Sequence, residues 1–450
     1  MIVAKFGGTS VGDAPAIRRL VGIVAERRAA QPLVVVSALA GVTDALLGLA
    51  ELTARGDAEE LAAGMAALER RHREVEGELS GTGTETDSIA ADLAAIGVEL
   101  RAELGRPLSA RSLDRLVGHG EAWSSRLVVA ALREAGIPAE RADARGFVRT
   151  DDRFGRARPQ HDDLVALSRA ALLPCLSAGT VVVTQGFVGA TDDGTPTTLG
   201  RGGSDYTAAL LGAALDASCV EIWTDVSGLM TADPRIVPTA STLAEASYEE
   251  AAELATFGAK VLHPATQAPL VRKGIPIRVL NSRQPAHPGT LIGPEARLER
   301  LNDSPIRSIS YKKGITTLSV RAPRMLGAFG FLRRLFEVFE RHEVVVDVVA
   351  TSEVSVSLTI EEPARLADLR PDLEAIGELR VDEGRAIVAV IGIGLRDTPG
   401  VAARVFTATQ PANVEIISQG ASAINITFVT REAEGPDIVR RLHTEFFGGS

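Results

Sequence analysis

The feature that most constrains the fold is a short apolar run that leads directly into small residues at the N-terminus. Residues 2–4 (IVA) are suited to a buried strand, and residues 5–10 (KFGGTS) follow without a break. Glycines leave backbone N–H groups accessible to an anion, and Lys5 adds a positive charge suited to a phosphate. A helix is expected next, with the apolar residues of 16–20 on one face. This arrangement favours a phosphate site, although a tight turn beside a solvated lysine remains the alternative.

The same design is repeated one strand later. Residues 33–36 (LVVV) indicate a second buried strand, and residues 37–44 (SALAGVTD) form another turn of small residues before a helix. Two parallel strands that end in small polar loops predict an α/β layer with ligands at the carboxyl ends of its strands. The phosphate-loop pattern G-x-x-x-x-G-K-[ST] does not occur.

Composition excludes several classes of protein. The 450 residues suffice for roughly two to four domains, and 45% hydrophobic with 24% charged residues is an ordinary globular mixture. The net charge of −10 and the lack of a basic block argue against nucleic acid as a partner. Only Cys175 and Cys219 occur, which suits a reducing compartment and argues against disulfides or cysteine-ligated zinc. No signal peptide or run of about 18 apolar residues is present, so we expect a cytoplasmic protein without membrane contact.

Residues 44–135 read as almost entirely helical, with breaks at 81–84 and near Pro107. Within this region, residues 118–121 (GHGE) interrupt the helical texture and place Glu121 in a turn or at a helix start. A buried glutamate needs a partner, and the ammonium group of a ligand would serve. The alternative is a glutamate that caps a helix, and His119 is expected to be structural.

Residues 181–189 predict a core strand that runs into a glycine turn, and a polar hairpin follows at 192–194. The stretch 197–210 then places Arg201 between glycines, with Ser204 or Asp205 starting a helix. Helix N–H groups, a guanidinium and a carboxylate converge there. Because glycines cannot pack an arginine in place, we interpret Arg201 as functional.

The chain continues with a strand at 220–225, a turn-rich loop to 235, a helix at 248–259 that extends through 264, and a strand at 277–280. The proline-rich stretch 285–294 indicates a boundary. After residue 305 two similar units follow, each predicted as strand, helix, strand, strand. The first comprises 316–320, 330–340, 344–349 and 354–360, and the second comprises 386–393, 400–408, 414–417 and 423–429. Two copies of a stable fold without a ligand are the alternative to a regulatory pair.

Four motifs, taken together and in this order, closely resemble aspartate kinases: residues 5–10 (KFGGTS), 200–205 (GRGGSD), 223–226 (WTDV) and 257–264 (FGAKVLHP). The C-terminal repeat looks like the paired ACT domains of those enzymes. The resemblance covers essentially the whole chain, and no homoserine dehydrogenase portion follows, so the chain is similar to the monofunctional type.

The resemblance implies an α/β fold: an amino-acid-kinase-type sandwich around a largely parallel sheet, followed by two α+β ACT domains of ferredoxin-like fold. It places the catalytic domain at residues 1–300 and the first ACT domain at 322–393. The second ACT domain is split, comprising 306–321 plus 394–450. ACT domains in this family pair between subunits, so a homodimer or a dimer of dimers is implied.

The implied reaction transfers the γ-phosphoryl group of ATP, with Mg²⁺, to the side-chain carboxylate of L-aspartate. The product is 4-phospho-L-aspartate, made in the first step towards lysine, threonine and methionine. Phosphoryl transfer requires mainly positioning and charge stabilisation, and a carboxylate nucleophile needs no strong general base. Lys5 and Asp205 are the implied catalytic pair: Lys5 neutralises charge, and Asp205 pairs with it or lies near Mg²⁺. No metal site built from protein side chains is expected.

The family motifs also imply two sets of binding residues. Those for ATP are Lys5, Gly7, Gly8, Ser10, Thr224, Asp225, Met230, Arg235, Lys260 and Val261. Those for L-aspartate are Ser37, Thr43, Glu121, Phe187, Arg201, Gly202, Gly203 and Ser204. Glu121 would face the substrate ammonium, and Arg201 would hold a carboxylate with two parallel hydrogen bonds. Met230 departs from the family pattern, in which tyrosine is frequent, although methionine can still pack on adenine.

The C-terminal half resembles the inhibitor site of lysine-sensitive aspartate kinases. Asp347 and Glu353 would meet the ammonium groups of lysine, and Gly330 would start a helix whose N–H groups bind its carboxylate. Ala328 replaces a common serine and so removes one hydrogen bond. Threonine is the competing effector. The implied residues are Met325, Ala328, Gly330, Phe331, Leu332, Val345, Val346, Asp347, Thr351, Ser352 and Glu353.

Three other functions remain open at this point. Another amino-acid kinase, acting on glutamate or a related acid, is disfavoured by Glu121 and by the ACT pair. A catalytically dead amino-acid sensor is disfavoured by the intact Lys5, Arg201 and Asp205. A nucleotide-binding regulator is disfavoured by the net charge.

Overall fold

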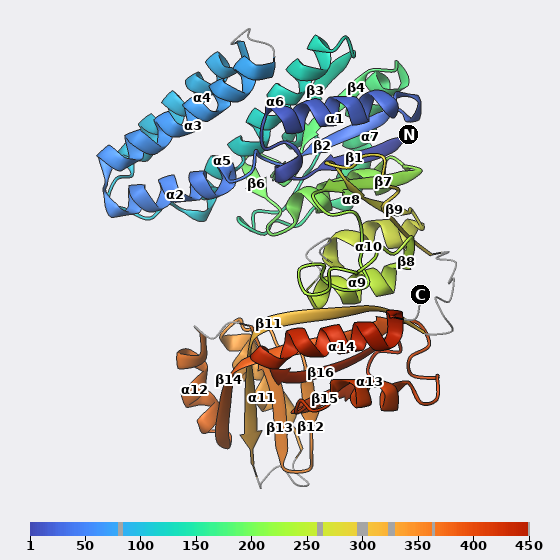
Figure 1. Cartoon of the computed structure of the whole chain (residues 1–450). Helices are drawn as coiled ribbons and strands as arrows, with labels where there is room; N and C mark the ends of the chain where they lie inside the picture. The colour runs from blue at the N-terminus through green and yellow to red at the C-terminus, as the bar shows by residue number, and fades with distance from the viewer. Residues whose placement is uncertain (80–83, 259–263, 295–304, 323–328, 362–364, 449–450) are drawn as a thin grey trace. The chain divides into compact units, whose positions relative to one another are not determined.

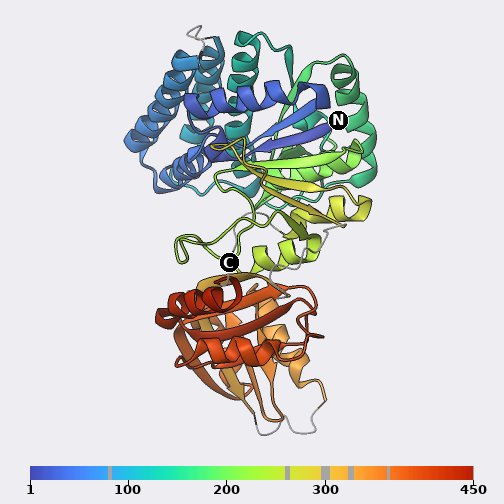
Figure 2. The same cartoon turned by 45° about the vertical axis from the view of Figure 1, so that its right-hand side comes forward.

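The computed structural model describes residues 1–79, 84–258, 264–294, 305–322, 329–361 and 365–448 (Figures 1 and 2). It divides into two compact units. The first comprises Met1–Leu229, Ala244–Tyr248 and Val261–Ala296, and the second comprises Met230–Leu243, Glu249–Lys260 and Arg297–Ser450. Two short segments of the central sequence thus belong to the second unit.

The first unit is built on an eight-stranded sheet with the order β3-β4-β2-β1-β7-β9-β10-β8. The six strands from β3 to β9 in this order are parallel, β10 is antiparallel to β9, and β8 is parallel to β10. β10 lies inside the proline-rich stretch 285–294 that was predicted as a boundary, so residues 290–293 of that stretch belong to the sheet. The strands are β1 Ile2–Phe6, β2 Pro32–Val36, β3 Ala139–Ala142, β4 Val181–Gln185, β7 Cys219–Thr224, β8 Glu245–Ser247, β9 Ile277–Asn281 and β10 Thr290–Gly293.

Helices cover both faces of this sheet, as is usual for a largely parallel sheet (Figure 1). The expected first helix forms with Asp13 as its N-cap, whose carboxylate accepts a hydrogen bond from Ala16 N at 2.7 Å. The predicted helical region 44–135 is confirmed as five helices, although most of its expected break at 81–84 lies outside the described residues. The helices up to residue 273 are α1 Ala14–Glu26, α2 Val42–Arg55, α3 Ala58–Leu79, α4 Thr84–Ala102, α5 Ala110–Val117, α6 His119–Glu134, α7 His161–Ser177, α8 Gly203–Ala214, α9 Tyr248–Thr256 and α10 Pro264–Lys273.

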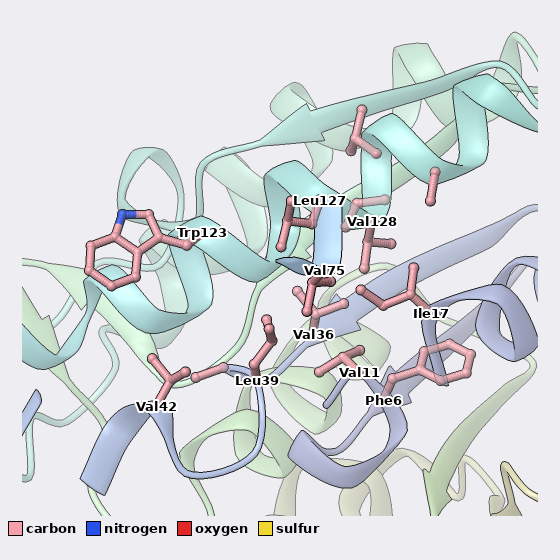
Figure 3. Close-up of a cluster of buried hydrophobic side chains, with 14 of the residues drawn as sticks. Phe6, Val11, Ile17, Val36, Leu39, Val42, Val75, Trp123, Leu127 and Val128 are labelled. Atoms are coloured by element: carbon pink, nitrogen blue, oxygen red, sulfur yellow. The ribbon is translucent and has the colours of Figure 1, made fainter. Parts of the chain in front are cut away.

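A large core lies between the sheet and the helices α1, α2, α3, α4 and α6 (Figure 3). Phe6 and Val36 point into it from neighbouring strands, and Ile17, Trp123 and Leu127 meet them from the helices. Phe6 also stacks on Trp223 with 5.9 Å between ring centroids. Since side chains alternate along a strand, burying Phe6 here directs the side chain of Lys5 to the other face of β1.

The strand expected at 181–189 is interrupted. β4 ends at Gln185, and Phe187 adopts a left-handed backbone with φ 70°. β5 (Val188–Ala190) then pairs with β6 (Pro196–Thr198) as a separate two-stranded sheet, and the predicted polar hairpin joins them. α8 begins at Gly203, one residue earlier than the sequence predicted.

The second unit contains a six-stranded sheet with the order β12-β13-β11-β14-β16-β15. Its centre consists of two long antiparallel strands, β11 (Ile306–Arg321) and β14 (Glu378–Gly392), which pair along most of their lengths. The other strands are β12 Val349–Thr351, β13 Ser355–Ile360, β15 Ile416–Gln419 and β16 Asn425–Arg431. The helices are α11 Phe331–Arg341, α12 Leu366–Glu374, α13 Val401–Thr409 and α14 Gly435–Phe447.

The predicted repetition of strand, helix, strand and strand is confirmed in both halves of this sheet. Three expected strands are displaced: β12 begins only at Val349, and β15 and β16 are each shifted two residues beyond the predicted 414–417 and 423–429. Val344 and Val348 are buried without belonging to a strand. Their apolar pattern therefore indicated burial correctly but not a strand. Each half has its own core, one with α11 and α12, the other with α13 and α14.

Residues 230–243, called the 230–243 segment below, pack in the second of these cores. Ala232 and Val237 are buried there with residues of β11 and α14. Ile309 N donates a hydrogen bond to Thr231 O at 2.8 Å, and Thr231 Oγ1 lies 3.0 Å from His443 Nε2. This segment is therefore built into the C-terminal sheet unit although its sequence lies between β7 and β8.

Candidate active site

A cavity of about 500 Å³ opens in the first unit where β1 and β2 end. Five separate stretches of the chain line it: the end of β1, the loop after β2, the start of α6, the turn after β4 and the start of α8. The sequence-predicted residues that meet in this cavity are Lys5, Gly8, Ser37, Thr43, Glu121, Phe187, Arg201, Gly202, Gly203, Ser204 and Asp205. Every predicted substrate residue and both predicted catalytic residues are thus brought together.

Lys5 and Asp205 form an ion pair at this cavity, with 2.7 Å between Nζ and Oδ1. Lys5 comes from the central strand and Asp205 from the first turn of α8, so two rigid elements hold the pair. Both side chains are mostly buried, which strengthens their attraction relative to a surface pair. The pair places one fixed positive charge where residues 5–10 leave the sheet.

Glu121 lies in the first turn of α6 and is almost completely buried. Its Oε1 accepts a hydrogen bond from Ala38 N at 3.1 Å, while Oε2 has no hydrogen-bond partner within the described part of the chain. Burial raises the pKa of this carboxyl to about 7. A Cβ on Gly120 would lie 2.8 Å from Ala38 Cβ, so glycine allows this close approach between α6 and the loop after β2. The neighbouring His119 donates from Nδ1 to Arg115 O at 2.8 Å and packs on Trp123, as expected of a structural residue.

Arg201 is exposed at the cavity and makes no ion pair with any residue that the structure describes. It sits in a tight turn between Gly200 and Gly202, with φ of 77° and 72°, where the left-handed backbone favours glycine. Gly203 N donates to Gly200 O at 3.0 Å and closes the turn. The turn therefore fixes the backbone of Arg201 at the cavity, and its guanidinium is available to an anionic ligand.

Phe187 forms one wall of the cavity and is fixed by a buried hydroxyl. Its N–H donates to Thr207 Oγ1 at 3.0 Å, and that hydroxyl donates to Gly203 O at 2.9 Å. Thr207 is fully buried in α8. One hydroxyl thus links the left-handed turn at Phe187 to the start of the helix that carries Ser204 and Asp205.

The predicted nucleotide residues are only partly assembled in the first unit. Gly7 donates its N–H to Trp223 O, so this amide is already hydrogen-bonded to the neighbouring strand. Ser10 Oγ lies 2.8 Å from Ser282 Oγ. Thr224 ends β7, and the exposed Asp225 follows it. Met230 and Arg235 belong to the second unit, where Arg235 pairs with Asp233 at 2.7 Å. Lys260 and Val261 lie outside the described residues.

Sequence reasoning missed some residues at this site. Residues 38–41 and Asp44 also line the cavity, and the predicted turn of small residues at 37–44 was the signal for them. Ser282 was missed as well, and it hydrogen-bonds Thr224 O at 3.1 Å besides Ser10. Its signal was weaker, because a single serine after a predicted strand is common.

The predicted effector residues lie in the second unit. Gly330 is the N-cap of α11 with φ 75°, and Phe331 is buried while Leu332 and Val345 are exposed. Asp347 Oδ2 lies 3.3 Å from Lys312 Nζ; burial raises the pKa of this carboxyl, and the ammonium opposes the shift. Val346 packs at the edge of the first core, and Thr351, Ser352 and Glu353 are exposed. Met325 and Ala328 fall outside the described residues.

Comparison with known proteins gives the family. A model of the amino acid kinase family matches residues 1–281, and a model of the ACT domain matches residues 388–446. Lysine-sensitive aspartokinase 3 of Escherichia coli K12 is 41% identical over 99% of each chain. The chain belongs to the aspartokinase family. A second member, the chloroplastic aspartokinase 2 of Arabidopsis thaliana, is 35% identical over 99% of this chain and 84% of that protein.

Solved aspartokinase structures have the same architecture. The crystal structure of E. coli aspartokinase III in complex with aspartate and ADP (R-state) aligns with a TM-score of 0.86 at 40% identity, over 99% of this chain and 100% of that one. Its complex with lysine and aspartate (T-state) aligns with a TM-score of 0.83 at 40% identity, over 99% of each chain. The predicted fold class, an amino-acid-kinase-type sandwich around a largely parallel sheet followed by ACT domains, is therefore confirmed.

The residues that the structure describes show neither a membrane-spanning helix nor a cluster of metal ligands. Among their helices, none is both long and apolar enough to cross a membrane. Their histidines, cysteines and acidic side chains do not gather anywhere in a group of three or more suited to a metal ion.

Proposed function

We propose that this chain transfers the γ-phosphoryl group of ATP to the side-chain carboxylate of L-aspartate, forming 4-phospho-L-aspartate. The observation that carries the proposal is the single cavity that joins the Lys5–Asp205 pair to Glu121 Oε2 and the Arg201 guanidinium, both without a partner among the described residues. An α-amino dicarboxylic acid has one cationic and two anionic groups. Glu121 and Arg201 match the ammonium and a carboxylate, which leaves the second carboxylate free to react near Lys5.

The chemistry that these residues perform is mainly positioning and charge stabilisation. The aspartate carboxylate attacks the γ-phosphorus, the bond from phosphorus to the bridging oxygen of ADP breaks, and no proton has to be removed from the nucleophile. Lys5 stabilises the negative charge on the transferring group, and Asp205 holds the lysine in place. Bound ATP and aspartate would fill the cavity and so limit the access of water to the acyl phosphate.

ATP is the proposed phosphoryl donor, with Mg²⁺ bound mainly through its phosphate oxygens. Mg²⁺ in such sites keeps several waters and uses only one or two protein carboxylates, so a single acid beside Lys5 suffices. Asp205 is the residue that would contact it. Gly8, Ser10, Thr224 and Asp225 are proposed to contact the nucleotide from the first unit, and the remaining predicted nucleotide residues keep that role as proposals.

Lysine is the proposed inhibitor, and threonine is the alternative. The solved complex of the E. coli relative with lysine and aspartate supports lysine. We place the catalytic domain at residues 1–300, the first ACT domain at 322–393, and the second at 306–321 plus 394–450. We further propose a cytoplasmic homodimer or dimer of dimers joined through the ACT domains, which light scattering would test.

The deciding experiment supplies purified protein with ATP, Mg²⁺ and L-aspartate, and traps acyl phosphate as a hydroxamate with hydroxylamine. Aspartate-dependent hydroxamate with matching release of ADP is expected. A preference for glutamate would favour the glutamate-type kinase, and no hydroxamate with either acid would favour the sensor. Lysine and threonine, added singly and together, identify the effector.

A further inference from the structure

Asp114 of α5 is a buried carboxylate that the reaction does not use directly. Only 2% of the residue is exposed, and no cation pairs with it in the part of the chain that the structure describes. Both of its oxygens accept hydrogen bonds instead. Gly155 N donates to each at 2.9 Å, Thr198 N donates to Oδ2 at 2.8 Å, and Thr198 Oγ1 donates to Oδ1 at 2.8 Å. Such a fully satisfied carboxylate rigidly joins the segments that donate to it.

One of the joined segments leads to Arg201. Thr198 is the last residue of β6, and the turn that holds Arg201 begins two residues later at Gly200. Gly155 supports the same turn from the side, because a Cβ on Gly200 would lie only 3.1 Å from Gly155 O. Ala157 N also donates to Thr198 O at 2.9 Å. The two donors to Asp114 therefore set the position of the arginine turn.

The helix that carries Asp114 leads to Glu121. α5 ends at Val117, α6 begins at His119, and Gly118 N donates to Asp114 O at 3.1 Å across this junction. Glu121 lies in the first turn of α6. A second contact between α5 and the hairpin, from Arg111 Nη2 to Thr195 Oγ1 at 2.8 Å, ties the other end of the same helix. Asp114 is thus the buried link between the elements that present Glu121 and Arg201.

We propose that Asp114 is a positioning residue that sets the distance between the ammonium-binding Glu121 and the carboxylate-binding Arg201. This inference rests on the proposed function. The distance determines which amino dicarboxylic acid places its side-chain carboxylate next to Lys5. Glutamate is one methylene longer than aspartate, and a methylene alone gives only modest discrimination in an adaptable pocket. A site of fixed spacing discriminates better, because the longer acid misplaces its reacting carboxylate.

The experiment compares Asp114→Asn and Thr198→Val with the parent enzyme. Asp114→Asn keeps the size but turns an NH₂ group towards the N–H donors, and Thr198→Val removes one of the hydrogen bonds. We expect the KM for L-aspartate to rise about tenfold or more in Asp114→Asn and about threefold in Thr198→Val, with the KM for ATP unchanged. The ratio of kcat/KM for aspartate over glutamate should fall in the same order. Thr198→Ser, which keeps the hydroxyl, should restore parental values.

Asp92→Asn is the matched control for general destabilisation. Asp92 accepts hydrogen bonds from Trp123 Nε1 at 3.0 Å and Arg126 Nη1 at 2.9 Å, and it does not line the cavity. This variant should lose stability without a change in the KM for aspartate. If Asp114→Asn does not fold, the KM for aspartate and the substrate ratio of Thr198→Val test the inference.

The inference is overturned if folded variants keep the parental KM for aspartate and the parental substrate ratio. It is also overturned if the KM values for aspartate and ATP rise together. A parent enzyme that makes no acyl phosphate from aspartate would instead refute the proposed function, so the two failures are distinguishable.

Discussion

At the scale of single residues, the two oxygens of Glu121 differ in a way that bears on pH dependence. Oε1 is held by Ala38 N, Oε2 is free of protein donors in the described chain, and burial raises the pKa to about 7. An ammonium ligand binds the carboxylate and not the neutral acid. Protonation of Glu121 and binding of aspartate therefore compete.

We predict that kcat/KM for L-aspartate falls about tenfold per pH unit below pH 7 and levels off above it. Initial rates at saturating ATP, from about pH 5.5 to 8.5, measure this profile. Glu121→Gln should be slower above pH 7 and should lack the inflection. A parental profile that is flat through neutral pH would show that Glu121 does not bind the ammonium.

The same shift has the opposite consequence for the stability of the unliganded protein. The folded state retains the Glu121 proton up to about pH 7, whereas an ordinary glutamate loses it near pH 4.5, so folding binds a proton in this window. Stability contributed by the neutral form is therefore lost as pH rises through the window. Glu121→Gln should have the higher melting temperature above pH 7, and a lower one would mean that Glu121 is structural.

Lys5→Ala should reduce kcat by about 10²- to 10³-fold, because one preorganised charge on the transferring group is lost. The free energy of unfolding should change by only about 1–2 kcal/mol, since Asp205 borders an open cavity that water can enter. Lys273→Ala, which breaks a lysine–aspartate pair away from the cavity, is the control and should keep full activity. Turnover within a few-fold of the parent would exclude the catalytic role of Lys5.

At the scale of elements, the turn at Phe187 packs against the start of α8 with no spare room. A Cβ on Gly186 would lie 2.7 Å from Ser204 Cα, so an alanine must push the substrate helix away. We predict that Gly186→Ala costs about 1–3 kcal/mol of stability and raises the KM for aspartate. Thermal unfolding and initial rates would measure both.

Gly48 provides the matched control for this substitution. It lies within α2, and a Cβ there would meet no atom within 4 Å. Gly48→Ala should be neutral or stabilise by about 1 kcal/mol through helix propensity. If both variants behave alike, close packing at Gly186 does not govern the site.

The elements that sequence predicted well are those with long, regular patterns. The buried strands β1, β2 and β7 were marked by short apolar runs, and the helices from α2 to α6 by a long stretch rich in Ala, Leu, Glu and Arg. α12 and α14 were not predicted, and β12 was misplaced because Val344 and Val348 are buried outside any strand. The interruption at Phe187 was also missed, since its left-handed backbone depends on a hydroxyl twenty residues away.

The candidate site was predictable where charge and glycine occur together. Arg201 was recognisable because a charge among glycines has few structural explanations, whereas the catalytic roles of Lys5 and Asp205 came from the family resemblance. Asp114 and Ser282 act through contacts with residues distant in the sequence, and a lone acid or serine carries no local sign of that. Which elements meet at the cavity was supplied by family resemblance and not by periodicity.

At the scale of the whole molecule, feedback inhibition is expected to depend on Asp347. Its carboxylate is already near Lys312, so a bound lysine ammonium would compete with that side chain. We predict that Asp347→Ala relieves lysine inhibition and leaves turnover without lysine largely intact. Inhibition curves of both proteins with lysine measure this effect. An unchanged curve would show that Asp347 is not part of the effector site.

The 230–243 segment bears on whether feedback control could be removed by cutting the chain. Met230 and Arg235, both proposed to contact ATP, belong to a segment whose Ala232 and Val237 are buried against β11 and α14. A fragment that stops near residue 300 would lose this support and expose both apolar side chains to water. The segment that carries these two residues therefore depends for its packing on elements that come later in the sequence. We therefore expect single substitutions to be the better route to a deregulated enzyme, because truncation would also remove the packing that supports these two proposed nucleotide residues.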